Sequence, residues 1–394
     1  MLLVVGCAQV RSPLVTTAEQ GATLARMDGT REATLLGATR DQLTRLVEAG
    51  ADLWSVMPRQ ARAKGALTPA QAELARRLGI VVQWGPQRQA LKQADPSYRN
   101  YDRVLNRLRE LAALRPELAT LVDVGDSWEK TRKAADRDLW ALHLVKNPGK
   151  PVVVIAGCHH AREIVTPELV LRMAEHLVLN YGQDDAITQT LNDRDVWLIP
   201  LVNPDAYGRA LAGADWRKNA NNDTGGRRRV GVDLNRNYDI AWGTVGDSGN
   251  KEADTFRGSA PFSEPETQAM RDLLSRTRPI IYLTYHSYGN VVMWPWDHKD
   301  EPPADPRLAR LGQQLGKLAG YDAYQGSKMY LNSGDDVDWA HAKLGTLAYT
   351  VEVGSWSDGF MPDASRLSAF WTVNRPLMWY AIRAADNPGV TPVL

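Results

Sequence analysis

Two histidines and one acidic residue follow apolar runs of the sequence, and these residue types bind transition metals. The run Val152–Ala156 leads into a turn that contains His160 and Glu163, and His-x-x-Glu spacing lets both side chains face one point. Alone this pattern is weak, because a polar surface turn would look the same. A second run, Ile280–Tyr285, is followed directly by His286. Two histidines and a carboxylate form the open ligand set with which catalytic zinc binds water.

The strands that would deliver these ligands lie in a region where predicted strands and helices alternate. Strands are predicted at 139–144, 152–156, 196–201, 280–285, 291–296 and 347–353. Helices are predicted at 101–114, 167–179, 264–276, 306–319 and 365–385. This alternation predicts an α/β fold, an α/β/α sandwich on a mixed, mostly parallel sheet. The carboxyl edge of such a sheet is where α/β proteins usually place their sites.

A smaller α/β unit is predicted ahead of this region, at residues 22–85. Its strands are predicted at 22–27, 32–36, 53–57 and 80–84, separated by two helices. The second helix begins at Thr68-Pro69, a capping residue followed by proline, and stops at Gly79. The chain is thus divided into a leader at 1–21, this unit, a polar linker at 86–96, the large unit at 97–385 and a tail at 386–394. We expect Arg88, Lys92 and Arg99 to be exposed to a trypsin-like protease.

The overall composition excludes some classes of partner and of metal site. The chain has 47 basic and 46 acidic residues, so it lacks the basic excess that nucleic-acid binding needs. Its two cysteines, Cys7 and Cys158, are too few for a disulfide framework or a cysteine metal cluster. Any metal must therefore be held by histidines and carboxylates. The cluster Arg227-Arg-Arg229 is expected to be a solvated loop.

The start of the sequence, Met-Leu-Leu-Val-Val-Gly-Cys, resembles the end of a bacterial lipoprotein signal, in which the cysteine carries a lipid. The charged start and longer apolar stretch of such a signal are missing. Either the numbering begins inside the signal or Cys7 is an ordinary thiol. The first alternative predicts an extracytoplasmic protein, secreted or attached to the membrane only through a lipid on Cys7.

Several ordered motifs resemble the zinc carboxypeptidases related to carboxypeptidases A, B and T. They are Gly157-Cys-His-His-Ala-Arg-Glu163, Asn203-Pro-Asp205, Trp216-Arg-Lys218, Gly231-Val-Asp-Leu-Asn-Arg-Asn237, Pro261-Phe-Ser-Glu-Pro-Glu266, His286-Ser-Tyr288, Ser333-Gly, Asp338-Trp339 and Glu352. The resemblance covers residues 97–385 in the family's order. It implies one Zn²⁺ per chain, bound by His160, Glu163 and His286, with His159 only a neighbour. It also implies that Asp233 accepts a hydrogen bond from the first zinc histidine.

The same resemblance implies the residues that carry the reaction. Glu352 would take the proton of a zinc-bound water and deliver it to the leaving amine. A buried structural salt bridge is the alternative for this residue. Arg217 would stabilise the negative charge that develops on the carbonyl oxygen.

Recognition of a peptide C-terminus is implied by a further set of residues. Asn235 and Arg236 match the family's clamp for the terminal carboxylate, and the planar fork of arginine suits that anion. Tyr330 matches a mobile tyrosine that closes over the substrate. Arg162 resembles a residue that contacts the substrate further from its end, and Ser287 and Tyr288 belong to the same substrate-binding set.

The preference for the terminal side chain is less clear from the sequence. Val337 lies 15 residues before Glu352 (352 − 337), where the family holds the floor of its pocket, and valine favours aliphatic and aromatic side chains. Asp297 lies 11 residues after His286 (297 − 286), where another branch keeps an acidic residue for lysine or arginine. We expect an apolar or aromatic preference with some activity on basic termini.

Two other functions and one regulatory role remain open. A zinc amidohydrolase of the same fold, acting on acyl-amino acids or peptidoglycan peptides, would usually have altered the clamp. An inactive binding protein would have lost Glu352 or a ligand. The unit at 22–85 resembles the pro-domains of these enzymes. It is expected either to shield the cleft until a protease cuts between residues 86 and 100, or to act as a separate binding module.

Overall fold

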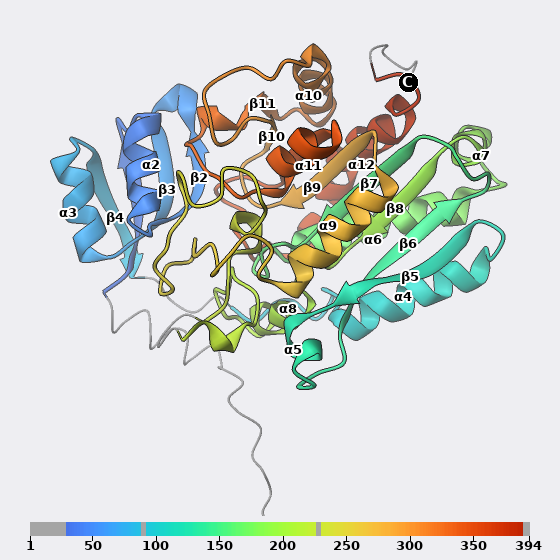
Figure 1. Cartoon of the computed structure of the whole chain (residues 1–394), viewed down its shortest axis with the longest axis horizontal. Helices are drawn as coiled ribbons and strands as arrows, with labels where there is room; N and C mark the ends of the chain where they lie inside the picture. The colour runs from blue at the N-terminus through green and yellow to red at the C-terminus, as the bar shows by residue number, and fades with distance from the viewer. Residues whose placement is uncertain (1–28, 88–91, 226–229, 389–394) are drawn as a thin grey trace, which may run out of the picture.

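The computed structural model of the chain describes residues 29–87, 92–225 and 230–388, which form two units, each built on its own sheet (Figure 1). The sheet of the N-terminal unit is antiparallel, with strand order β2-β3-β1-β4. Its strands are β1 (Arg31–Leu36), β2 (Asp52–Met57), β3 (Arg62–Leu67) and β4 (Val81–Gln87). Helices α2 (Arg40–Glu48) and α3 (Pro69–Arg77) pack their apolar side chains against this sheet in one cluster.

Local sequence explains where these two helices begin. The side chains of Thr39 and Thr68 each accept a hydrogen bond from the backbone N–H of the residue three positions later, Gln42 or Gln71. The side-chain oxygen of that glutamine accepts a hydrogen bond from the backbone N–H of the threonine. This capping box satisfies backbone N–H groups that the first helical turn leaves free. The predicted start of the second helix at Thr68-Pro69 is therefore confirmed.

The N-terminal unit contains one strand that the sequence did not predict. The strand predicted at 22–27 lies outside the described residues, and β3 was not predicted. Its sequence, Arg-Ala-Lys-Gly-Ala-Leu, has few of the branched and aromatic residues that are typical of strands. Gly65 is required where two backbones approach closely, because a Cβ at this position would lie 2.4 Å from the carbonyl oxygen of Asp52.

The large unit has an eight-stranded sheet with the order β11-β10-β12-β9-β7-β8-β6-β5. The strands are β5 (Ala119–Asp126), β6 (Asp138–Val145), β7 (Val152–Gly157), β8 (Asp195–Ile199), β9 (Ile281–His286), β10 (Val291–Trp294), β11 (Asp322–Gln325) and β12 (Leu347–Glu352). The four central strands, β12, β9, β7 and β8, are parallel, whereas β10, β6 and β5 are joined by antiparallel pairs. The predicted mixed, mostly parallel sheet is confirmed.

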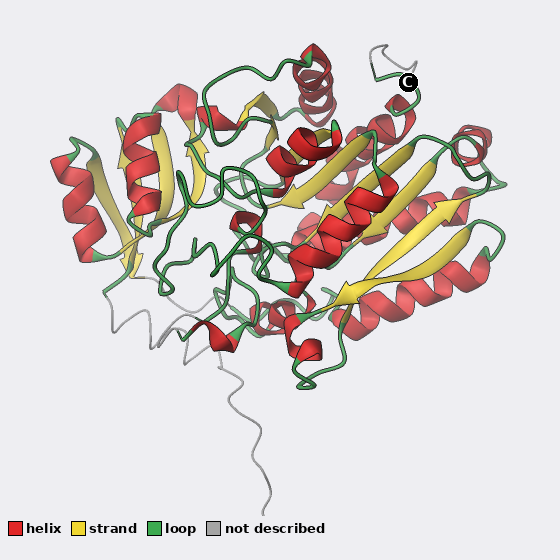
Figure 2. Cartoon of the chain, in the orientation of Figure 1, coloured by secondary structure: helices red, strands yellow, loops and turns green. Residues whose placement is uncertain are grey.

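Helices cover both faces of this sheet (Figure 2). The side chains of β7 alternate between two clusters: Val153 and Ile155 pack with one group of helices, and Val154 and Ala156 pack with the other. The first group is α4 (Tyr101–Leu114), α6 (Val165–Asn180), α10 (Pro306–Ala319) and α12 (Leu367–Ala384); the second is α9 (Pro265–Thr277) and α11 (Asp336–Leu344). Three shorter helices, α5 (Trp128–Thr131), α7 (Asp185–Asn192) and α8 (Pro204–Leu211), complete the unit. The predicted α/β/α sandwich is confirmed.

The two units meet through contacts that join distant parts of the sequence. The Trp356 indole donates a hydrogen bond to Ser55 Oγ at 2.8 Å, and the backbone N–H of Leu331 donates to Thr44 Oγ1 at 2.9 Å. Arg40 forms an ion pair with Asp300. Within the described ranges, no helix combines the length and the apolar character needed to cross a membrane.

Candidate metal centre and cleft

The ends of three adjacent parallel strands bring the predicted metal ligands together. In the sheet, β9 lies between β7 and β12, with Gly157 opposite Tyr285 and Glu352 opposite His286. The carboxyl ends of all three strands therefore reach one edge of the sheet. β9 and β12 end at His286 and Glu352, and β7 is followed by the turn that carries His160 and Glu163.

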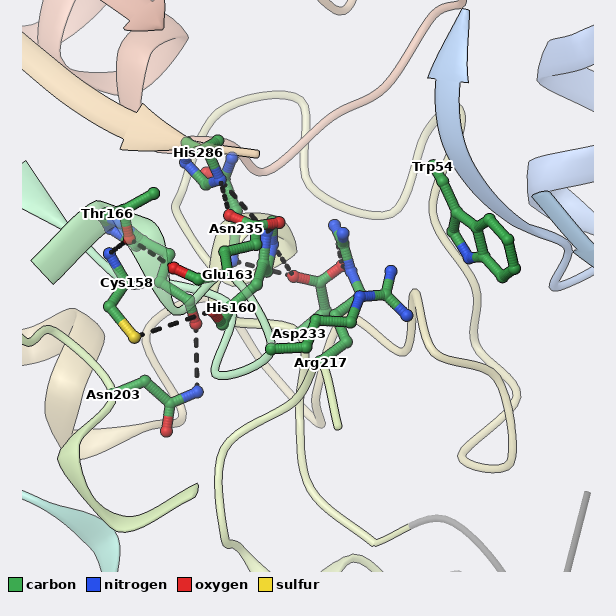
Figure 3. Close-up of polar contacts among 12 residues, drawn as sticks. Trp54, Cys158, His160, Glu163, Thr166, Asn203, Arg217, Asp233, Asn235 and His286 are labelled. Atoms are coloured by element: carbon green, nitrogen blue, oxygen red, sulfur yellow. Dashed lines mark hydrogen bonds and ion pairs between the residues drawn. The ribbon is translucent and has the colours of Figure 1, made fainter. Parts of the chain in front are cut away.

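His160, Glu163 and His286 converge on one point, and all three are buried (Figure 3). The Nδ1 atom of His160 lies 2.8 Å from Glu163 Oε1, and Nδ1 of His286 lies 3.0 Å from Glu163 Oε2. The two Nδ1 atoms are 3.1 Å apart. Two imidazole nitrogens and a carboxylate that face each other in a buried site are the donor set of a catalytic zinc ion. The residues present therefore fit a divalent metal.

Asp233 contacts the first of the two candidate histidine ligands. Its Oδ1 atom lies 3.1 Å from His160 Nε2, and its Oδ2 accepts from Arg217 Nε at 2.9 Å. A proton on Nε2 leaves the lone pair of Nδ1 for a metal. Burial raises the pKa of the Asp233 carboxyl, but the Arg217 cation and His160 outweigh it and hold the pKa below its usual range.

His159 lies beside this group without joining it. Its ring nitrogens contact Tyr238 Oη and Thr284 Oγ1, each at 3.2 Å, and burial lowers its pKa to about 4. The structure thus places His159 as a neighbour of the three predicted ligands.

The three candidate ligands line one cavity at this edge of the sheet. Its lining includes most of the predicted site residues: Glu352, Arg217, Arg162, Asn235, Arg236, Tyr330, Ser287 and Asp297. Sequence reasoning did not select several further lining residues, among them Met293, Asn332, Gly326 and Phe360. These four have no chemical signature in the sequence, and only the fold brings them to the cavity.

Glu352 is a buried carboxyl group beside the metal ligands. Burial and the charge of Glu163 raise its pKa to about 7, against the opposing effects of His286 and Arg217. Its Oε2 atom has no hydrogen-bond partner among the described residues. A carboxyl group with a pKa near neutrality can take up and release a proton at physiological pH.

The candidate carboxylate clamp lies on the turn that follows Asp233. Arg236 Nη2 is 3.3 Å from Tyr330 Oη, and Nη1 donates to the carbonyl oxygen of Asn235 at 2.5 Å. Asn235 Oδ1 accepts from the backbone N–H of Asp336 at 3.0 Å, which ties this turn to helix α11. Arg236 Nε has no partner among the described residues. The guanidinium group is therefore held in place and retains a donor for an anion.

Asp297 and Val337, the two candidates for the pocket floor, occupy different places. Asp297 lines the cavity; its Oδ2 accepts from Asn332 Nδ2 at 3.3 Å, and its Oδ1 has no partner among the described residues. Burial and the nearby Asp338 raise its pKa well above the usual range. Val337 packs in the apolar cluster beneath helix α11 and is not among the residues that line the cavity.

Gly326 leaves room for the carboxylate of Asp297, because a Cβ at residue 326 would lie 1.8 Å from Asp297 Oδ1. Of the two candidates for the pocket, only Asp297 lines the cavity.

Tyr288, like Val337, is absent from the cavity lining, and its ring packs on Phe360 with centroids 4.9 Å apart.

The N-terminal unit reaches into the same cavity. Leu53 and Trp54 of strand β2 are among its lining residues, and Figure 3 shows Trp54 on the side of Arg217. Asp52 pairs with Arg162 through both carboxylate oxygens, each at 2.7 Å from a guanidinium nitrogen. The N-terminal unit therefore covers the cleft.

The linker is less accessible than its sequence suggested. Arg88 lies outside the described residues, and Lys92 is exposed. Arg99 was expected to be exposed, but its guanidinium contacts Glu168 Oε2 at 2.5 Å and its backbone N–H donates to Glu168 Oε1 at 2.7 Å. The backbone N–H of Ala94 donates to Leu211 at 2.9 Å. The chain is docked on the large unit from residue 94 onward, so Arg99 is a poor protease site.

Two buried carboxyl groups hold the loop that carries Arg217. Asn219 Nδ2 donates to Glu264 Oε2 at 2.7 Å and to Glu266 Oε2 at 3.1 Å. Glu266 Oε1 accepts from the backbone N–H of Trp128 at 2.8 Å. Burial, reinforced by the charge of Glu264, raises the pKa of Glu266 to about 8. At neutral pH this raised pKa favours the protonated form of Glu266.

We expect Glu266→Gln to stabilise the chain at alkaline pH and to have little effect near pH 5. Between 4.5 and about 8 the folded protein keeps a proton that the unfolded chain has lost, so the free energy of unfolding falls as pH rises. The loss is on the order of 1 kcal/mol per pH unit. Glutamine imitates the protonated side chain and removes this dependence. Thermal unfolding of both proteins near pH 5 and pH 9 measures the effect. A difference in thermal stability that has the same size at both pH values would contradict this prediction.

Comparison with known proteins supports the family suggested by the motifs. The profile described as zinc carboxypeptidase matches residues 104–376, more than half of the chain. Carboxypeptidase B of Astacus astacus is 33% identical over 276 residues, covering 65% of this chain and 86% of the relative. Mouse carboxypeptidase A2 is 32% identical over 255 residues, covering 62% of this chain but only 60% of the relative.

Two solved structures match this chain over most of its length. The crystal structure of carboxypeptidase A from Helicoverpa armigera matches with a TM-score of 0.77 and 26% identity, over 91% of this chain and 98% of that one. Thrombin-activatable fibrinolysis inhibitor matches with a TM-score of 0.69 and 20% identity, over 91% of this chain and 99% of that one. This second likeness shows the fold alone.

Proposed function

This chain belongs to the zinc carboxypeptidase family, and from that premise we propose that it is a metallocarboxypeptidase that removes the last residue of peptides with a free C-terminal carboxylate. One observation carries the proposal: the three candidate metal ligands and the Arg236 guanidinium line the same cavity. A fixed arginine beside a metal site suits an exopeptidase, because its fork binds a terminal carboxylate through two hydrogen bonds.

The roles proposed for the residues around the metal follow from their charge and position. His160, Glu163 and His286 would hold Zn²⁺, which would supply a Lewis acid and make a bound water more acidic. Glu352 accepts a proton on a carboxylate oxygen and returns it to the leaving amine. Arg217, fixed by Asp233, donates to the carbonyl oxygen as negative charge develops on it.

A direct test of the proposed activity compares two blocked dipeptides, one with a free terminal carboxylate and one with an amide. The chain, freed from its N-terminal unit, is expected to cleave only the first, and a chelator should abolish the cleavage until Zn²⁺ is restored. Release of the terminal residue is measured by chromatography. Cleavage of the amide at a comparable rate would instead favour the amidohydrolase alternative.

For the terminal side chain we propose a pocket that accepts basic residues through Asp297 as well as apolar ones. Asp297 Oδ1 is buried without a partner among the described residues, and it lines the cavity that Val337 does not reach. A lysine or arginine side chain would supply the missing donor. The place of Asp297 in the cavity thus strengthens the basic part of the preference expected from the sequence.

We predict that Asp297→Asn lowers kcat/KM for peptides that end in Lys or Arg by about 10- to 100-fold, the worth of a hydrogen bond to a charged group. Peptides that differ only in a terminal Phe should be affected little. Gly208→Ala is the matched control, because a Cβ at residue 208 meets no atom within 4 Å. An equal loss on Arg and Phe termini would refute the role of Asp297.

We also propose that residues 29–87 act as a pro-domain that keeps the enzyme latent until a protease cuts the linker. The contacts of Asp52, Leu53 and Trp54 with the cleft support this role. The exposed Lys92, ahead of the docked Ala94, is the proposed cleavage site. We also propose that the enzyme acts outside the cytoplasm, on the C-termini of peptides or proteins. The predicted lipid on Cys7 lies outside the described residues.

A further inference from the structure

Strand β9 carries three polar side chains on one face, at alternate positions that lead to the metal site. Tyr282, Thr284 and His286 are two residues apart, and successive side chains of a strand point to opposite faces, so these three share a face. All three are buried. A buried polar group is costly unless it forms hydrogen bonds, so each member of this row needs a partner.

The second ring nitrogen of His286 faces Thr284 rather than the other metal ligands. Nδ1 of His286 lies 3.0 Å from Glu163 Oε2, whereas Nε2 lies 3.3 Å from Thr284 Oγ1. A metal binds the ring nitrogen that carries no proton, so metal binding at Nδ1 places the proton on Nε2. His286 then donates this hydrogen to the hydroxyl oxygen of Thr284.

His159 is the next residue in this chain of hydrogen bonds. Thr284 Oγ1 lies 3.2 Å from His159 Nδ1, and because the hydroxyl oxygen accepts from His286, its own hydrogen is available for this contact. On the other side of the ring, His159 Nε2 lies 3.2 Å from Tyr238 Oη and 3.3 Å from Asp336 Oδ2. Both oxygens can accept from an N–H group. The hydrogen bonds therefore run in one direction, away from His286 and toward the Asp336 carboxylate.

Asp336 is held from two sides at the first residue of helix α11. Its Oδ2 accepts from Tyr282 Oη at 2.6 Å, and its backbone N–H donates to Asn235 Oδ1 at 3.0 Å. The dipole of the helix favours a carboxylate at this end. Asp336 is therefore fixed both to strand β9 and to a member of the candidate carboxylate clamp.

We propose that Thr284, His159 and Asp336, here called the His286 relay, are positioning residues that orient His286 for metal binding. The arrangement resembles that of the first histidine ligand, His160, whose Nε2 meets the Asp233 carboxylate directly. For His286 the carboxylate acts through two intermediate side chains. The inference rests on the metal site of the proposed function and adds three residues to it.

The zinc affinity of the full chain tests the His286 relay separately from turnover. Metal-free protein is titrated with Zn²⁺ in competition with a chromogenic chelator. Thr284→Val removes the hydroxyl and keeps the shape of the side chain, and it should raise the zinc dissociation constant about 10-fold, a usual effect of losing the partner of a metal-bound histidine. Thr284→Ser retains a hydroxyl and should keep the constant close to that of the unsubstituted chain.

Thr346→Val is the matched control at the opposite edge of the sheet. Thr346 directly precedes β12, is buried, and donates to the carbonyl oxygen of Pro279 at 2.8 Å. The substitution removes a buried, hydrogen-bonded hydroxyl of the same kind, so it should lower the thermal stability and leave the zinc dissociation constant unchanged. An equal rise of this constant in Thr346→Val and Thr284→Val would show a general effect of stability and would overturn the proposal.

Asp336→Asn tests whether the carboxylate acts through the same chain of hydrogen bonds. Alone it should weaken zinc binding, but by less than Thr284→Val. The double variant should bind zinc no more weakly than Thr284→Val alone, because the connection to His286 is already broken. Two losses that multiply in the double variant would overturn the relay. If Asp336→Asn does not fold, the variants of Thr284 and Thr346 decide the proposal by themselves.

The outcomes separate the His286 relay from the activity. If Thr284→Val leaves the zinc dissociation constant unchanged while the chain freed from its N-terminal unit trims peptides, the carboxypeptidase proposal stands and the relay fails. If zinc affinity falls in Thr284→Val and is kept in Thr284→Ser, but no peptide is trimmed by the unsubstituted enzyme, the relay stands and the proposed activity fails.

Discussion

Glu352→Gln is expected to remove nearly all turnover while the protein still binds its metal. Glutamine keeps the size of the side chain but can neither accept the proton of the attacking water nor deliver one to the leaving amine. General acid–base catalysis contributes about 10²- to 10⁴-fold to a rate, so kcat should fall by that order. Release of the terminal residue from a blocked dipeptide measures kcat, and metal analysis of the same sample measures zinc.

The pH profile gives a second readout for Glu352. Burial and Glu163 raise its pKa to about 7, and only the ionised form can act as a base. Activity should therefore fall as pH drops through this pKa. A bound cation favours the carboxylate, so the acid limb of kcat/KM should lie at or below about 7. Glu110→Gln, on the exposed side of α4, is the matched control. Normal kcat in the Glu352→Gln variant would disprove the assignment.

Cutting the linker is the second change with a large expected effect. In the intact chain Leu53 and Trp54 line the cavity and Asp52 pairs with Arg162, and we propose that the docked N-terminal unit thereby keeps a peptide out. If the unit is docked about 99% of the time, the intact chain shows about 1% of the activity of the open enzyme, and a cut after Lys92 raises the rate about 100-fold. Activity followed during limited proteolysis measures this rise in rate, and sequencing of the new N-terminus identifies the position of the cut.

Asp52→Ala in the intact chain offers an independent check of latency. It breaks the ion pair with Arg162 but leaves the linker whole, so it should relieve part of the inhibition without proteolysis. Arg59 also bridges the two units, through Asp322 at 3.1 Å, but both side chains are largely exposed. Arg59→Ala should therefore change little. If the intact chain is as active as the cut chain, a pro-domain role is ruled out.

The sequence allowed the central sheet and the ligand set to be predicted for a physical reason. Buried parallel strands are continuous apolar runs, and β7, β9 and β12 each show one. The polar residue at the end of such a run must lie at the edge of the sheet. His286 was recognisable on this ground alone, whereas Glu352 and the roles of both residues came from the resemblance.

Other parts of the fold could not be read from local patterns. β5 is an edge strand with Thr, Asp and Gly among its residues, and it is completed only by pairing with β6. The ion pair between Asp52 and Arg162 joins residues 110 positions apart, and no local pattern predicts it. Asp297 shows the same limit: spacing suggested it, but its burial and its neighbour Gly326 came only from the fold.

The position of His286 and Glu352 within hydrogen-bonded strands also bears on which parts of the protein can open transiently. Both residues belong to the ladder between β9 and β12 at the middle of the sheet, so transient opening of a surface loop cannot separate them. Arg217 and Asp233, in contrast, lie on connecting segments that can detach in brief local fluctuations. Amide exchange at residues 286 and 352 should therefore require unfolding of the whole large unit.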